Sequence, residues 1–183
     1  MTQIWIVRHG EAAASWEKDP DPGLSQLGQS QAEETANALM DIVPMGAQLI
    51  SSPLRRAQET AAAFANKRGD SVRVDSRFSE VRSPVPLSGR KAWLQEFMRQ
   101  DWSEQSDDLW EWRRDILSGL KEATGPTVVF CHFLVINAVI AEIENKPEVL
   151  QIYPANASFH ELKLAGGELS LVQLGQQMET RIN

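Results

Sequence analysis

The chain has 183 residues, 42% of them hydrophobic, which is enough for a buried core, and we expect residues 1–183 to form a single domain. Its net charge of −7, from 18 Lys and Arg residues against 25 Asp and Glu residues, argues against general binding to nucleic acid or anionic membranes. One cysteine rules out an internal disulfide, and no signal-like or membrane-spanning apolar run is visible, so we expect a cytoplasmic protein.

The start of the chain predicts a strand, a helix and a second strand. Apolar, branched residues at 3–7 are typical of a strand buried on both faces. Apolar side chains at helical spacing predict a helix over residues 25–40, with Leu27 on its apolar face. Residues 47–50 predict the second strand.

The same alternation continues along the chain. A helix is predicted over residues 53–67, with Ser52 as its cap and a proline at its first position. Residues 72–74 predict a short strand, and the apolar run at 127–131 predicts a buried one. An apolar helix over residues 133–144 follows it directly.

The end of the chain and a long middle segment complete the predicted fold. Predicted strands at 157–164 and 169–174 flank a glycine pair, which favours a hairpin. Residues 82–124 show no convincing strand and hold four tryptophans, which we interpret as core: Trp93, Trp102, Trp110 and Trp112. We therefore predict an α/β three-layer sandwich, with a mostly parallel sheet, an antiparallel C-terminal strand and a helical insertion at about 82–124.

Basic and imidazole side chains stand at the ends of three predicted elements. Arg8 and His9 follow the first strand, and His132 follows the strand at 127–131. Arg55 and Arg56 open the helix after the second strand. In open sheets of this kind ligands bind beyond the carboxyl ends of the strands, so we expect these side chains to converge.

Such a cluster suits phosphate chemistry. Guanidinium groups and a helix N-terminus favour a compact anion, and a neutral imidazole among them can act as a nucleophile. A carboxyl group can protonate the leaving oxygen and then activate water, and Glu80 is the candidate. Glu80 also has a structural interpretation, as an ion-pair partner of Arg77 or Arg82.

The chain resembles the histidine phosphatase, or phosphoglycerate-mutase-like, superfamily. The resemblance rests on five motifs in the order of that family: VRHGE from Val7, LSQLGQSQA from Leu24, SSPLRRAQETA from Ser51, RFSE from Arg77 and VVFCH from Val128. It implies that His9 is phosphorylated, that Glu80 donates the proton and that the phosphoryl oxygens are held by Arg8, Arg56 and His132. It implies no metal and no organic cofactor.

The sequence departs from the family pattern at some positions. The family often has asparagine where this chain has Ser15, and glycine where it has Phe133. These two residues and Asn156, which resembles a position near the pocket in relatives, are our further candidates for substrate binding. The segment between Glu80 and His132 is short for a mutase, so we favour the phosphatase branch and a metal-independent phosphomonoesterase.

Alternative functions remain open. The run from Asp19 to Ser25 and the short length are similar to phosphatases that act on phosphohistidine of a partner protein. Phosphoglycerate-mutase-type transfer is a further enzymatic possibility, and a phosphate-binding module without turnover is the non-enzymatic one. The sequence does not decide between a small phosphorylated substrate and a phosphorylated protein, and it leaves the role of Arg55 and the oligomeric state open.

Overall fold

A six-stranded sheet forms the centre of the protein in a computed structural model that describes residues 1–15 and 18–179. The strand order is β3-β2-β4-β1-β5-β6. The pairs β3–β2, β2–β4 and β4–β1 are parallel. β5 runs antiparallel to β1, and β6 pairs antiparallel with β5. The strands are β1 (Thr2–Arg8), β2 (Gln48–Ser51), β3 (Arg73–Val74), β4 (Thr127–Cys131), β5 (Phe159–Ala165) and β6 (Glu168–Gln173). The predicted mostly parallel sheet with a closing hairpin is confirmed.

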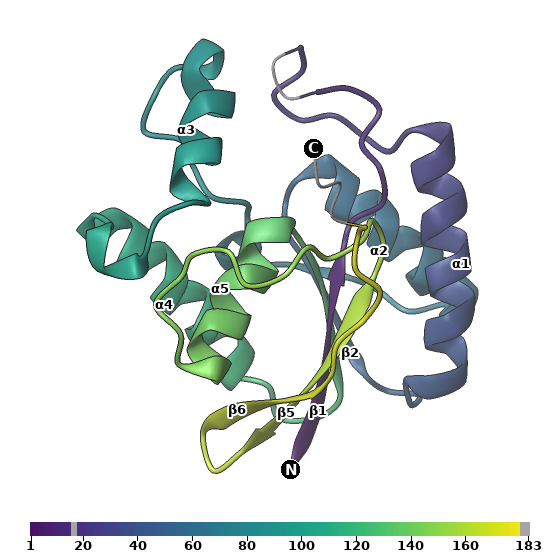
Figure 1. Cartoon of the computed structure of the whole chain (residues 1–183). Helices are drawn as coiled ribbons and strands as arrows, with labels where there is room; N and C mark the ends of the chain where they lie inside the picture. Colours follow the sequence, from purple (N-terminus) through teal and green to yellow (C-terminus); the bar gives the residue numbers. More distant parts are fainter. Residues whose placement is uncertain (16–17, 180–183) are drawn as a thin grey trace.

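Helices cover both faces of this sheet (Figure 1). α1 (Gln26–Ile42) and α2 (Arg55–Arg68) lie on one face, and α4 (Asp107–Lys121) and α5 (Phe133–Glu144) lie on the other. Successive residues of β1 point to opposite faces, so Trp5 and Val7 pack with α1 and α2, whereas Ile4 and Ile6 pack with α5. Both faces of β1 are therefore buried, as its continuous apolar run predicts.

The predicted insertion is helical and carries its own aromatic core. It contains η2 (Leu87–Gly89), α3 (Arg90–Phe97), η3 (Trp102–Glu104) and α4, and η1 (Ser76–Phe78) precedes it. Trp102 is 2% exposed, and its ring packs with Phe97, Trp110 and Trp112. The interpretation of the tryptophans as core is confirmed for this cluster. α3 lies away from the sheet, beyond the carboxyl end of β1, where Figure 1 shows it opposite the loop that precedes α1.

The predicted start of α2 was wrong. α2 begins at Arg55, and Leu54 is its N-cap without a side-chain cap bond. The reason is that Ser52 continues the sheet ladder, since its N–H donates to the carbonyl of Phe130 at 3.0 Å. Its hydroxyl instead accepts the N–H of Leu54 at 3.2 Å, which forms a turn between β2 and α2.

Two smaller predictions also differ from the structure. Leu27 was expected on the apolar face of α1, but it is 54% exposed. The face of α1 that is buried against the protein is formed by Ala32, Ala36 and Leu39, and Leu27 lies outside it. β5 begins at Phe159 instead of residue 157, since Ala157 has φ 58°, a left-handed conformation that cannot continue a strand.

Candidate active site

The carboxyl ends of β1, β2 and β4 lie next to one another and bring three chain segments together. The ladder continues one residue beyond the strands, because the N–H of His9 donates to the Cys131 carbonyl at 3.1 Å. The rings of His9 and His132 consequently lie 5.2 Å apart between centroids, tilted by 59°. The two histidines that follow β1 and β4 therefore lie close together, as expected from the strand ends.

Hydrogen bonds on both ring nitrogens fix the tautomer of His9. Arg56 Nε lies 3.1 Å from His9 Nε2, and a guanidinium can only donate, so Nε2 carries a lone pair. Nδ1 lies 2.6 Å from the Gly10 carbonyl and therefore carries the proton and donates it. Burial, with Arg56 and Arg8 adding to it, lowers the pKa of His9 to about 3. His9 thus presents a neutral, unprotonated Nε2 at ordinary pH.

Close packing holds the loop after His9 against the helices. The N–H of Gly10 donates to the hydroxyl of Thr60 in α2 at 3.0 Å. A Cβ on Gly10 would lie 2.5 Å from the Gly28 carbonyl oxygen of α1, so only glycine permits this approach. Glu11 then accepts the hydroxyl of Ser25, the N-cap of α1, at 2.9 Å. The loop is therefore anchored on both sides of the imidazole.

Arg8 and His132 supply buried polar groups to the same cluster. Arg8 Nη1 donates to the Pro154 carbonyl at 2.8 Å, and burial lowers the pKa of Arg8 to about 10. His132 Nε2 lies 2.8 Å from the Ser52 hydroxyl, and burial holds its pKa well below the ordinary value. Arg8 Nε and His132 Nδ1 are buried without a hydrogen-bond partner among the described residues. Unpaired buried polar atoms are costly, so they are typical of a site that takes a polar ligand.

Glu80 is a partly buried carboxyl group at this cluster. Burial raises its pKa, although N–H groups of Leu134 and Val81, at 3.2 and 3.1 Å, and the charges of Arg56 and Arg8 oppose that rise. Arg77, the partner in its structural interpretation, instead pairs with Asp75 at 2.7 Å and Glu122 at 2.8 Å. A carboxyl group with a raised pKa is suited to hold and release a proton.

A cavity of about 540 Å³ opens from these groups. Its lining includes Arg8, His9, Arg56 and Glu80, and beyond them Phe133 and Asn156. Ser15 is exposed and lies outside this lining, so the structure does not bring that candidate to the cavity. Arg55 is exposed, lies outside this lining and pairs with Glu59 at 3.5 Å.

Arg90 and Lys91 are cavity residues that the sequence analysis missed. Both lie in the first turn of α3. Burial lowers the pKa of Arg90, and the negative charge of the nearby Glu80 carboxylate opposes this effect. No motif or strand end marks them, because α3 reaches the cavity only through the fold of the insertion.

The other polar core residues have structural roles. His160 Nδ1 accepts the N–H of Gly175 at 2.9 Å, and burial lowers the pKa of His160 to about 4. Burial raises the pKa of the Cys131 thiol, so this residue is an unreactive part of the core. Within residues 1–15 and 18–179, no group of three or more His, Cys, Asp or Glu side chains is arranged to hold a metal ion. Over the same residues, no helix is both long and apolar enough to cross a bilayer.

The arrangement can bind and transfer a tetrahedral oxyanion. His9 lines the cavity together with Arg8 and Arg56, and Arg56 Nε lies 3.1 Å from its unprotonated Nε2. Guanidinium groups at such a place can neutralise charge on transferring oxygens. A carboxyl group with a raised pKa lines the same cavity.

The chain is similar to proteins of known family. The sequence model of the histidine phosphatase superfamily (branch 1) matches residues 4–177. A glucosyl-3-phosphoglycerate phosphatase of Mycolicibacterium vanbaalenii is 35% identical over 85 residues, which are 44% of this chain and only 37% of that protein.

Solved structures show the same fold at lower identity. Bacillus stearothermophilus YhfR superposes with a TM-score of 0.75 at 16% identity, over 94% of this chain and 96% of that one. A mycobacterial glucosyl-3-phosphoglycerate phosphatase in complex with VO3 gives 0.69 at 22% identity, over 97% of this chain and 100% of that one.

Proposed function

Since the chain belongs to the histidine phosphatase superfamily, branch 1, we propose that it hydrolyses phosphomonoesters through a phosphohistidine on His9, without a metal ion. The observation that carries this proposal is the tautomer of His9, whose Nε2 is unprotonated and directed by Arg56. A nucleophilic nitrogen held neutral among cations is what attack on phosphorus requires.

In the first half of the proposed reaction, His9 Nε2 attacks phosphorus and the bond to the ester oxygen breaks. Protonated Glu80 gives its proton to that oxygen, so the alcohol leaves neutral. Arg8 and Arg56 donate to the phosphoryl oxygens, and Arg56 exchanges its bond to Nε2 for one to phosphate. The buried Nδ1 of His132 also has no hydrogen-bond partner among the described residues. In the tautomer that carries a proton on Nδ1, it can donate a hydrogen bond to a phosphoryl oxygen.

In the second half, water attacks the phosphorus of phospho-His9. Ionised Glu80 takes a proton from this water, inorganic phosphate leaves, and the lone pair returns to Nε2. The Gly10 carbonyl accepts the hydrogen bond of the Nδ1–H group throughout and can stabilise positive charge on the ring. No step needs a group beyond those of the chain, the substrate and water.

The walls of the cavity favour a small ester whose alcohol has apolar surface. Beyond the charged groups, the lining is mainly apolar. It comes from the loop before α1, from α3 and its C-cap, from the start of α5 and from the C-terminal segments: Ala12, Ala14, Pro22, Leu94, Met98, Phe133, Leu134, Tyr153 and Met178. A volume of about 540 Å³ is in the ordinary range of small-molecule sites. A protein phosphohistidine as substrate stays the second enzymatic candidate, and mutase-type transfer the third.

We further propose that residues 1–183 act as one domain in the cytoplasm, on a small phosphorylated substrate. The matched range 4–177 supports the single domain, and the unreactive Cys131 is compatible with a reducing compartment.

A phosphate-release screen tests this function. Aryl, alkyl, sugar and phospho-amino-acid phosphates are incubated with the wild type and His9→Ala, with EDTA present in every reaction. We expect release by the wild type from at least one phosphomonoester and none by His9→Ala. Equal release by both proteins would contradict the nucleophile, and release only without EDTA would contradict metal independence.

A further inference from the structure

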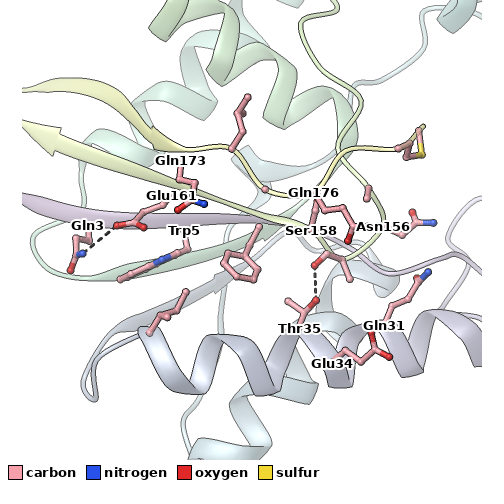
Figure 2. A pocket seen from close by; sticks show the side chains of 17 residues that line it. Gln3, Trp5, Gln31, Glu34, Thr35, Asn156, Ser158, Glu161, Gln173 and Gln176 are labelled. Carbon is pink, nitrogen blue, oxygen red and sulfur yellow. Dashed lines mark hydrogen bonds between the residues drawn. The ribbon is translucent and has the colours of Figure 1, made fainter. Parts of the chain in front are cut away.

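A second cavity, of about 850 Å³, lies on the face of the sheet that α1 covers. It is larger than the cavity at His9, and it is bounded by α1, by β1 and β5, and by the segments at 155–159 and 173–178. Figure 2 shows Gln3, Trp5 and Glu161 on the sheet toward one end of the cavity. Toward the other end, Gln31, Glu34 and Thr35 on α1 lie below Ser158, Gln176 and Asn156 in that view. The proposed phosphatase reaction uses neither this cavity nor most of its residues.

The indole of Trp5 borders this cavity and carries an unsatisfied donor. Trp5 is 1% exposed and lines the cavity, and its Nε1–H is buried without a partner among the described residues. Tryptophan N–H groups in protein interiors usually donate to an acceptor, as Trp112 does to the Ser79 carbonyl at 3.0 Å. An acceptor from a ligand would remove the cost of this unpaired donor.

The polar lining of this cavity is uncharged apart from carboxylates. It is composed mainly of amides and hydroxyls, namely Gln3, Gln31, Gln173, Gln176, Asn156, Thr35 and Ser158, with Glu34 and Glu161. None of the lining residues is Lys, Arg or His, so the cavity does not suit a phosphate or another anion. Amide groups both donate and accept, which matches hydroxyl groups, and carboxylates accept from hydroxyls.

We propose that this cavity binds an uncharged, hydroxyl-rich small molecule of the saccharide type. Its volume is in the range of small-molecule sites, and Trp5, whose Nε1–H has no partner among the described residues, is part of its lining. Two of its polar groups are already oriented, since Thr35 donates to the Ala157 carbonyl at 2.6 Å and Gln3 to Glu161 at 3.3 Å. Such preformed contacts reduce the ordering that binding requires.

The second cavity shares a wall with the candidate active site. Asn156 and Met178 line both cavities, and Met178 Sδ lies 3.6 Å from Arg8 Nη1. The ligand of the second cavity therefore lies beside the reaction without access to the cations that hold phosphate. The proposal goes beyond the phosphatase function and stands if that function fails.

Indole N–H signals in ¹⁵N-correlated NMR spectra test this proposal. The wild-type protein is titrated with glucose, galactose, sucrose and maltose, and the Trp5→Phe variant assigns the Trp5 signal. We expect at least one of these sugars to shift the Trp5 signal in a saturable manner. The Trp102 N–H, which is also buried without a partner but packs inside the aromatic cluster of the insertion, is expected to stay unchanged. If Trp5→Phe does not fold, triple-resonance spectra of the wild type give the assignment.

Matched glutamine variants locate the binding. Gln31→Ala removes a lining amide of α1, and we expect it to weaken sugar binding about 2- to 10-fold, the usual effect of one neutral hydrogen bond. Gln29→Ala, on the exposed side of the same helix, is expected to leave the affinity unchanged. Spermidine, a cationic amine, is titrated as a comparison ligand. The proposal is overturned if no sugar shifts the Trp5 signal, or if spermidine alone shifts it. It is also overturned if both variants bind the sugar with the affinity of the wild type.

Discussion

The imidazole of His9 is held in one orientation by groups on both of its nitrogens. Arg56 requires a lone pair on Nε2 and the Gly10 carbonyl requires a proton on Nδ1, so one tautomer satisfies both. Burial among cations also keeps this ring neutral. Both properties, orientation and charge, are those of a nucleophile at neutral pH.

The lowered pKa of His9 predicts how folding stability depends on pH. The unfolded chain binds a proton at His9 near pH 6.5, whereas the folded protein does so only near pH 3. The unfolded state therefore holds more protons between these values, and stability is lost as the pH falls from 6.5 toward 3. His9→Asn, which removes this group, is expected to lose stability less steeply over the same range.

Urea unfolding at a series of pH values measures this difference. His160 is present in both proteins, and burial alone lowers its pKa. The charge of His9 also lowers the pKa of His132, so the difference between the two slopes reports His9 together with its effect on His132. Identical slopes in the wild type and His9→Asn would contradict the lowered pKa.

Glu80 is the residue whose substitution separates the two enzymatic candidates. Glu80→Gln removes the proton donor, so we expect kcat on alkyl phosphates to fall by about 10²- to 10⁴-fold. Phosphohistidine already has a good leaving group, and hydrolysis of a phosphohistidine peptide is expected to fall much less. Kinetics on both substrates give the comparison.

Glu122→Gln is the matched control for this variant. Glu122 is exposed and pairs with Arg77 outside the cavity, so its substitution should leave both activities unchanged. An equal and large loss on both substrates after Glu80→Gln would contradict leaving-group protonation as its role.

At the scale of elements, α3 and its C-cap form one part of the apolar wall of the cavity, and the sequence did not predict their place there. Met98 follows α3, is partly buried and lines the cavity. Met98→Gln keeps an unbranched side chain but makes it polar. We expect kcat/KM for naphthyl phosphate to fall about 4- to 15-fold, since one or two buried methylene groups contribute about 0.8 kcal/mol each.

Methyl phosphate, which is too small to contact this wall, is expected to react with Met98→Gln as with the wild type. Met40→Gln on α1, where Met40 is 41% exposed, serves as the control variant. Two results would contradict the apolar wall as a determinant of specificity. One is a wild type with a higher kcat/KM for glycerol phosphate than for naphthyl phosphate. The other is an equal fall in kcat/KM for naphthyl and methyl phosphate in Met98→Gln.

The elements also show which sequence signals are sufficient. β4 and α5 were predicted to the residue, because a continuous apolar run ends before His132 and the following helix is mostly apolar. The start of α2 was missed because Ser52 has two possible roles, helix cap or ladder residue, and only its neighbour β4 decides between them. Local sequence cannot report such a tertiary hydrogen bond.

At the scale of the whole molecule, sheet topology accounts for most of what the sequence could predict about the site. Arg8, His9, Arg56 and His132 were placed together by parallel strands whose ends share an edge. Arg90 and Lys91 could not be placed, since they depend on how α3 folds over that edge. Ser15 was expected at the cavity from the family pattern alone, and the path of its loop leaves it exposed.

The central claim is that phosphate passes through Nε2 of His9. Wild type and Glu80→Gln are mixed with an aryl phosphate in EDTA, quenched in alkali after milliseconds to seconds, and examined by peptide mass spectrometry and ³¹P NMR. The account predicts an acid-labile phosphate on His9 at Nε2, absent from His9→Ala. Phosphate release without any phosphate on His9, or with phosphate on Nδ1, would contradict it.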